Sequence, residues 1–303
     1  MDLALSADQR AILDALDSLA KPYESAPLHE ARFTAVSSGL DRALRDGGFL
    51  DVAREPELGP VAAALVTERV ARLPYAVEAG ASALVGPLLF EDSVEPLCLV
   101  EAATATRPVR FLRGGARVVV LSDRAASLIA DEADVRPEPD ALFAYPMATL
   151  LRMDEAVPHG SVSPADVRTR WRIALAAEAA GLLAAALDSV VSHTSERQQF
   201  GRPLATFQAL RHRLAEAQVR ANGVHWLALR AAATLDPGDA ALAAFHAQES
   251  ARVVVYDFHQ FLGAMGITLE HPLHLFTYRL KWLIGELGGR GASAAAAAAA
   301  IWG

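Results

Sequence analysis

The chain has 303 residues, 52% of them hydrophobic, and a formal charge of −8 with its nine histidines neutral. This length allows one large domain or two to three small ones with a sizeable core. The acidic balance excludes a general nucleic-acid-binding protein, which needs a basic face. The single cysteine, Cys98, excludes an intrachain disulfide and a cysteine-based metal site. It is expected to be a small buried hydrophobe in a reducing compartment.

Residues 1–93 have the pattern of a helical N-terminal domain. Ser6 and Gln9 have the spacing of a capping box, in which each side chain bonds the other residue's amide. Pro60 suits the first turn of a later helix. No basic signal-peptide region precedes these helices, so we expect a soluble, cytoplasmic protein whose first domain serves packing.

Residues 94–160 predict a small middle β-domain, because short β-prone runs alternate with turn residues. The pair Gly114-Gly115 is expected to form a hairpin between two neighbouring runs. The predicted strands are Leu97–Val100, Val109–Leu112, Arg117–Leu121, Ser127–Ala130 and Leu142–Tyr145.

Residues 161–290 predict a four-helix bundle, because four long helical runs are joined by short breaks. Ser163 is a suitable N-cap for the first helix. Its most apolar stretch contains Glu178 and Asp188, which favours a buried helix over a membrane span. The tail, residues 291–303, carries seven consecutive alanines and is expected to be a frayed helix or disordered.

The break between the first two bundle helices, RQQFGRPLATFQALRHR, is the most informative stretch. Gly201 and Pro203 interrupt the helical pattern. Around them stand Arg197, Phe200 and Gln208. Arginine binds phosphate through a fixed fork of donors, and an aromatic face can stack on a ring. The corner therefore suits a planar anionic ligand.

A second break, HQFLGAMGITLEHP, ends the third bundle helix. Gly263 and Gly266 would let a pyrophosphate approach the backbone, and Gln260 can donate to it. His271 and His274 are three residues apart, but no further ligand pattern supports a metal site.

These two motifs resemble those of acyl-CoA dehydrogenases. The resemblance implies a helical N-domain, a middle β-domain and a C-terminal four-helix bundle, with FAD held between subunits. Arg197 would contact the pyrophosphate or adenosine of FAD, and Phe200 would pack on the flavin region. The remaining cofactor-binding residues implied are Gln208, Gln260, Gly263 and Gly266.

The family also needs a glutamate base, which removes the α-proton of the acyl-CoA thioester. Of the two places where the family keeps this base, one falls next to Glu286 and the other near Trp171. We expect Glu286 to be a solvated residue at a helix end and Glu178 to pair with a neighbouring chain. The family's threonine motif in the β-domain is missing.

With these departures, the chain resembles the short, degenerate subunit of bacterial heteromeric acyl-CoA dehydrogenases that shorten steroid side chains. The resemblance implies a larger partner subunit that supplies the glutamate, an acyl-CoA substrate and an electron-transfer flavoprotein as acceptor. Two alternatives stay open: a homo-oligomeric dehydrogenase that uses Glu286, and a helical scaffold that has lost FAD.

Overall fold

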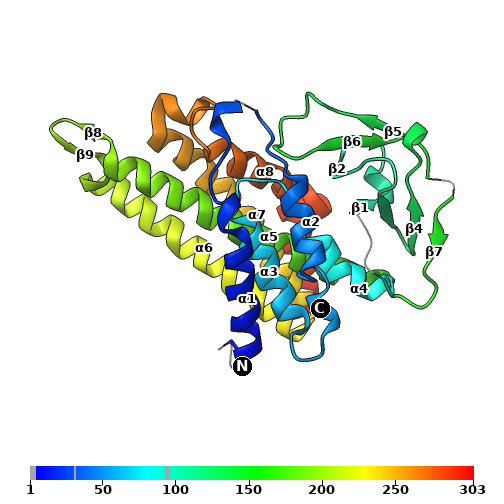
Figure 1. Cartoon of the computed structure of the whole chain (residues 1–303). Helices are drawn as coiled ribbons and strands as arrows, with labels where there is room; N and C mark the ends of the chain where they lie inside the picture. The colour runs from blue at the N-terminus through cyan, green and yellow to red at the C-terminus, as the bar shows by residue number, and fades with distance from the viewer. Residues whose placement is uncertain (1–4, 31, 93–95, 154) are drawn as a thin grey trace.

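The computed structural model describes residues 5–30, 32–92, 96–153 and 155–303. N-terminal helices pack against a bundle of long C-terminal helices, and two small sheets lie to one side of both (Figure 1). The predicted fold, mostly α with a small β region, is confirmed.

The N-terminal helices begin at the predicted capping box. The Gln9 amide donates to Ser6 Oγ over 3.1 Å, and the Ser6 amide donates to the Gln9 side chain over 3.1 Å. Leucines at helical spacing then bury one face of the first helix. The helices are α1 (Ala7–Ala20), α2 (Ser38–Asp46), α3 (Gly59–Ala71), a π-helical turn (Ala81–Val85) and α4 (Gly86–Leu89).

The β region forms two sheets. The first has the order β1-β3-β4-β7, with β1 and β3 parallel and the other pairs antiparallel. The second has the order β2-β6-β5 and is antiparallel. The strands are β1 (Leu97–Glu101), β2 (Val109–Arg110), β3 (Arg117–Leu121), β4 (Ala125–Ile129), β5 (Val135–Pro137), β6 (Met147–Leu150) and β7 (Val157–Pro158).

Two predictions about these strands were wrong. The glycine pair 114–115 does form a turn, with Gly115 at φ +77°, but it connects strands of different sheets and makes no hairpin. No strand forms at Leu142–Tyr145. Ala144 has φ +53°, and the following Pro146 lacks an amide donor, so the strand begins only at Met147.

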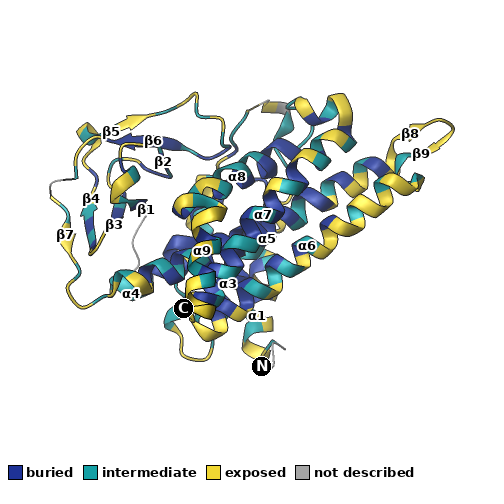
Figure 2. Ribbon diagram, turned by 180° about the vertical axis from the view of Figure 1, so that it is seen from behind, coloured by how far each residue is buried: buried dark blue, intermediate teal, exposed yellow. Residues whose placement is uncertain are grey.

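The C-terminal bundle is organised around α5 (Pro164–Glu196). Alanines along this helix allow close approach of its neighbours, and Figure 2 shows it largely buried. Its length and composition would also suit a membrane span, but 78% of its apolar window is buried inside the protein. The helices that follow are α6 (Gln208–Thr234), α7 (Pro237–Leu262) and α8 (Leu273–Gly285).

The alanine-rich tail is an ordered helix, α9 (Gly289–Trp302), which packs against α7. The expectation of a frayed or disordered segment therefore needs correction. Alanine favours helix and costs little side-chain entropy. Ala297 is buried, and the buried Ser293 hydroxyl donates to Gln248 Oε1 over 2.9 Å, which ties the tail to the bundle.

Candidate functional site

The corner between α5 and α6 is a short hairpin formed by β8 (Gln198–Gln199) and β9 (Arg202–Pro203). Its turn needs left-handed backbone at two positions, Phe200 at φ +54° and Gly201 at φ +77°. The Phe200 side chain is 88% exposed. The hairpin projects away from the bundle (Figure 1), and its aromatic residue is exposed there.

Donor groups surround this aromatic tip. Arg197 caps α5: its amide donates to the His193 carbonyl over 2.9 Å, and its side chain is exposed. The Arg202 guanidinium lies over the Phe207 ring, 4.1 Å from its centroid. Gln208 opens α6 and is also exposed. The two guanidinium groups, the Gln208 amide and the Phe200 ring thus face solvent, while the Phe207 ring is half-buried.

The second predicted motif forms the turn after α7. Gln260 is exposed on the last turn of the helix. Gly263 has φ +57°, and a Cβ there would meet no described atom within 4 Å. Gly266 is different: a Cβ would lie 2.8 Å from the His259 carbonyl oxygen, so this glycine is needed for the turn itself. Only Gly263 leaves room for a ligand beside the backbone.

His259 fixes this turn from inside. Its Nδ1 lies 2.6 Å from the Gly266 carbonyl, and its Nε2 lies 3.0 Å from Thr277 Oγ1. Burial lowers the pKa of His259. A neutral ring with its proton on Nδ1 can donate to the Gly266 carbonyl, and its Nε2 then shares the single proton of the Thr277 hydroxyl with the Leu273 carbonyl, 3.0 Å from that hydroxyl.

The hairpin and the glycine turn lie at the same end of the bundle. The rings of His193 and His271 are 5.5 Å apart, and Arg213 pairs with Asp257 over 2.5 Å. Burial, followed by the nearby His193, lowers the pKa of His271 to about 4.

The residues 5–30, 32–92, 96–153 and 155–303 contain no cluster of His, Cys, Asp or Glu side chains able to hold a metal ion.

A separate cavity of about 370 Å³ lies between the β region and the other end of the bundle. Its wall is mostly apolar, with aromatic rings from both parts of the fold. Such a cavity suits a small apolar ligand with a few polar contacts. The lining includes Leu99, Glu101, Thr104, Arg107, Arg110, Phe143, Trp171, Lys281, Trp282, Glu286 and Leu287.

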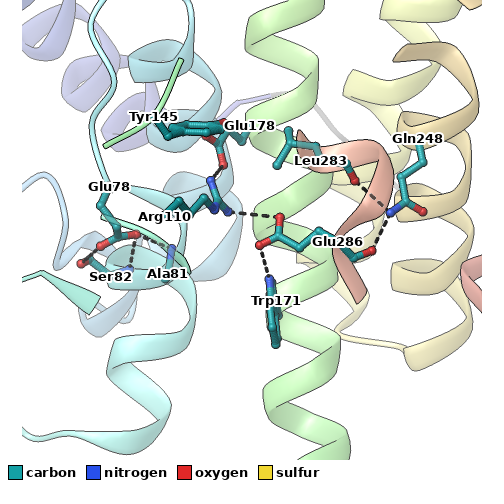
Figure 3. A network of polar contacts seen from close by, with 10 residues as sticks. All are labelled: Glu78, Ala81, Ser82, Arg110, Tyr145, Trp171, Glu178, Gln248, Leu283 and Glu286. Atoms are coloured by element: carbon teal, nitrogen blue, oxygen red, sulfur yellow. Dashed lines mark hydrogen bonds and ion pairs between the residues drawn. The ribbon is translucent and has the colours of Figure 1, made fainter. Parts of the chain in front are cut away.

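Glu286 contributes its carboxylate to this cavity, and the expectation that it is solvated was wrong. Its side chain is 7% exposed. Trp171 Nε1 donates to one carboxylate oxygen over 3.2 Å, and Arg110 Nη2 lies 3.4 Å from the other (Figure 3). The two regions where the resemblance places the base, one next to Glu286 and one near Trp171, thus meet in space.

Glu178 belongs to the same network, so its predicted pairing with a neighbouring chain was also wrong. Arg110 Nη1 donates to one of its oxygens over 2.5 Å, and the Tyr145 hydroxyl donates to the other over 2.6 Å. Burial raises the pKa of Glu286, and Arg110 opposes that change. Burial also raises the pKa of Tyr145, which keeps its hydroxyl a donor.

The turn that carries Glu286 is held from α7. The Gln248 amide, fully buried, donates to the Leu283 carbonyl over 3.0 Å and to the Glu286 carbonyl over 2.8 Å. Leu287 follows with φ +55°, an uncommon conformation for a branched side chain. The backbone and the carboxylate of Glu286 are therefore both fixed.

Hairpin and cavity lie at opposite ends of α5. Trp171 and Arg197 are about 39 Å apart along its axis at about 1.5 Å per residue. The structure thus joins the predicted residues into two groups: the hairpin and glycine turn at one end, and Glu286 at the other.

Sequence reasoning missed Arg110, Tyr145 and Gln248. Arg110 is 68 residues from Glu178 and 176 from Glu286. No local spacing connects residues so far apart. The one available signal was the acidic Glu178 within an alanine-rich helix, which requires a buried partner.

Comparison with known proteins agrees with this architecture. Residues 169–285 match the family described as acyl-CoA dehydrogenase, C-terminal domain. Acyl-CoA dehydrogenase FadE34 of Mycobacterium tuberculosis is 33% identical over 204 residues, which are 63% of this chain but 29% of that protein. Acyl-CoA dehydrogenase IpdE2 of Mycolicibacterium smegmatis is 29% identical over 65% of this chain and 68% of that protein.

Solved structures share the whole fold. The Tcur3481-Tcur3483 steroid ACAD G363A variant has a TM-score of 0.82 at 22% identity, covering 97% of this chain and 98% of its counterpart. The ChsE4-ChsE5 complex from M. tuberculosis has a TM-score of 0.75 at 18% identity, with 97% of each chain covered. A glutaryl-CoA dehydrogenase from M. smegmatis in complex with FADH2 has a TM-score of 0.71 at 15% identity, with 98% and 95% covered.

The three-part architecture is the acyl-CoA dehydrogenase fold. The family match itself covers residues 169–285, within the C-terminal bundle. It spans less than a third of FadE34 and about two thirds of IpdE2.

Proposed function

We propose that this chain is a cytoplasmic subunit of an FAD-dependent acyl-CoA dehydrogenase and that it supplies part of an FAD site shared with a larger subunit. Bound FAD would accept the hydride that leaves the β-carbon of the acyl-CoA. Arg197 and Gln208 would hold the dinucleotide from the hairpin, and Gln260 from the glycine turn. Phe200 would pack on the flavin region. An electron-transfer flavoprotein would reoxidise the cofactor.

The position of the hairpin is the observation that carries this proposal. It lies about 39 Å along α5 from the chain's own cavity, and its aromatic tip is 88% exposed. A cofactor that contacts the hairpin therefore belongs beside a cavity on another subunit. The open space at Gly263 and the exposed side chain of Arg197 suit a phosphate there.

The proposal gives the glutamate base to the larger subunit. In this chain, Glu286 shares Arg110 with Glu178 and accepts a bond from Trp171. Opposite charge lowers the proton affinity of a carboxylate, so Arg110 makes Glu286 a weaker base than a glutamate buried here without a cation would be. The substrate class we propose is the CoA thioester of a bulky, steroid-derived acid, as the description of the Tcur3481-Tcur3483 relative suggests.

Co-purification tests this function. The chain is co-expressed with a larger acyl-CoA dehydrogenase-like subunit, and the intact complex is examined for flavin absorbance and for reduction by an acyl-CoA. A yellow complex whose flavin is bleached by substrate supports the proposal. A colourless complex that takes up no added FAD would exclude it and leave a scaffold role.

A second candidate is a homo-oligomeric dehydrogenase that uses Glu286 as its base. This alternative is favoured by the buried Glu286 carboxylate in the wall of a 370 Å³ cavity and by its raised pKa. Replacing Glu286 with glutamine keeps the side-chain shape and removes the base. The second candidate predicts that E286Q loses turnover by at least about 100-fold, whereas the first predicts unchanged turnover in the complex.

A further inference from the structure

Arg110 connects the β region to the bundle at one point. It ends the two-residue strand β2, and its guanidinium lies between the carboxylates of Glu178 and Glu286 (Figure 3). It also lies over the Tyr145 ring, 5.2 Å from the centroid. The side chain is 14% exposed. Its position is therefore fixed on all sides by described groups.

The two contacts of this guanidinium are unequal. Nη1 is 2.5 Å from Glu178, while Nη2 is 3.4 Å from Glu286. Glu178 is further held by the Tyr145 hydroxyl. Glu178 is thus the anchor that fixes Arg110, and the second nitrogen extends toward Glu286.

We infer that Arg110 is a positioning residue for Glu286: anchored by Glu178 and Tyr145, it orients the Glu286 carboxylate at the cavity wall and favours its charged form. Use of this cavity as a substrate site belongs to the second candidate function above, and the inference about the carboxylate does not rest on it. The effect on the carboxylate itself does not depend on FAD or on turnover.

Burial gives Arg110 this role. A buried carboxylate without a cation takes up a proton, and two carboxylates that face one site oppose each other's ionisation. The groups that act on Glu286 are Arg110 from β2, Glu178 and Trp171 from α5. Burial and Glu178 raise the pKa of Glu286, and Arg110 lowers it. Arg110 is the one cation among these groups.

Glu101, Arg107 and Lys281 line the same cavity as Glu286, and other charges lie further out. Arg279 is buried and donates to the carbonyls of Leu73 and Tyr75 over 2.9 and 3.1 Å. Glu78 is buried and accepts bonds from the amides of Ala81 and Ser82. Both have partners of their own, so neither replaces Arg110 at Glu286.

Trp171 offers a direct readout. Its indole donates to Glu286, so its fluorescence should change when that carboxylate is protonated. The chain has four tryptophans. Replacing Trp226, Trp282 and Trp302 with phenylalanine leaves Trp171 alone. Fluorescence is then followed against pH in the full chain, and the titration should be absent in the E286Q variant.

The test compares two matched variants in that background. Arg110→Met keeps much of the apolar stem and removes the charge. The midpoint of the pH titration of Trp171 fluorescence, which reports protonation of Glu286, should therefore rise by about one to three pH units. Glu178→Gln removes the carboxylate that competes with Glu286 for Arg110. Glu286 then has the only negative charge beside that guanidinium among the groups named here, so the midpoint of the same titration should fall. Circular dichroism establishes that each variant is folded.

An unchanged midpoint in both folded variants would overturn the inference, as would a fall in Arg110→Met. If Arg110→Met does not fold, Glu178→Gln decides alone: a lower midpoint supports the positioning role, and an unchanged or higher one refutes it. A purely structural role would lower stability without moving the midpoint. Failure of FAD binding leaves this result unaffected, so the two proposals fail separately.

Discussion

Replacement of Gln248 with leucine tests how the turn that carries Glu286 is held. The Gln248 side chain is fully buried and makes three hydrogen bonds. It donates to the carbonyls of Leu283 and Glu286 and accepts from the Ser293 hydroxyl. Leucine has a similar volume and none of these polar groups, so the change isolates the hydrogen bonds.

The structure sets the size of the effect. The Leu283 and Glu286 carbonyls each keep one backbone bond, from the amides of Glu286 and Gly289. They therefore lose one bond each and are not left unpaired. The Ser293 hydroxyl loses the acceptor to which it donates. At about 1 kcal/mol for each bond, the free energy of unfolding should fall by about 3 kcal/mol.

Urea unfolding followed by circular dichroism measures this loss, with every variant at the same protein concentration. Ser293→Ala is the matched control, because it removes one of the three bonds and should cost about 1 kcal/mol. A loss below about 1 kcal/mol for Gln248→Leu, or one equal to that of the control, would refute the reasoning.

Three further predictions concern stability. Gly181→Ala should lower stability by about 1–3 kcal/mol or more, because the new Cβ would overlap a backbone carbonyl of α3. Its control, Gly291→Ala, should be neutral or stabilising, because no described atom lies within 4 Å of the new Cβ. Equal effects of the two changes in thermal melts would contradict this. The pKa of His271 is lowered to about 4, so as the pH drops the unfolded chain binds this proton before the folded chain does. Stability should therefore fall as pH drops from 6.5 to about 4. A His271→Gln variant should lose less stability over this range, and an acid profile identical to that of the wild type would count against the assignment. Arg213→Ala removes an ion pair in which the Arg213 side chain is 49% exposed and the Asp257 side chain 19% exposed, and the change should cost less than about 1 kcal/mol in urea. A larger loss would mean that the pair does more than the exposure of Arg213 suggests.

Short sequence motifs correctly predicted the caps and turns that depend only on neighbouring residues. The capping box at Ser6, the helix break at Gly201 and the glycine turn at Gly263 all depend on residues within a few positions of one another. The structure forms each of them where the pattern indicated. The turn at Gly115 was also correct, but the pairing of its strands was not, since β3 pairs with the distant β1.

The carboxylate network could not be predicted in this way. Arg110 meets its partners only because the β region packs on the bundle, and its strand is two residues long. Glu286 was predicted to be solvated because it stands at a helix end, yet Gln248 from another helix binds the backbone of that turn. Burial created by distant segments decided both the contacts and the charge states.

Flavin content of the assembled complex tests the central claim most directly, with Arg197 and Gln260 changed to alanine in this chain alone. The account predicts that the wild-type complex binds FAD and that the variant complex, intact by size-exclusion chromatography, has lost most of it. Full FAD occupancy in the variant would show that the two exposed corners do not hold the cofactor and would contradict the account.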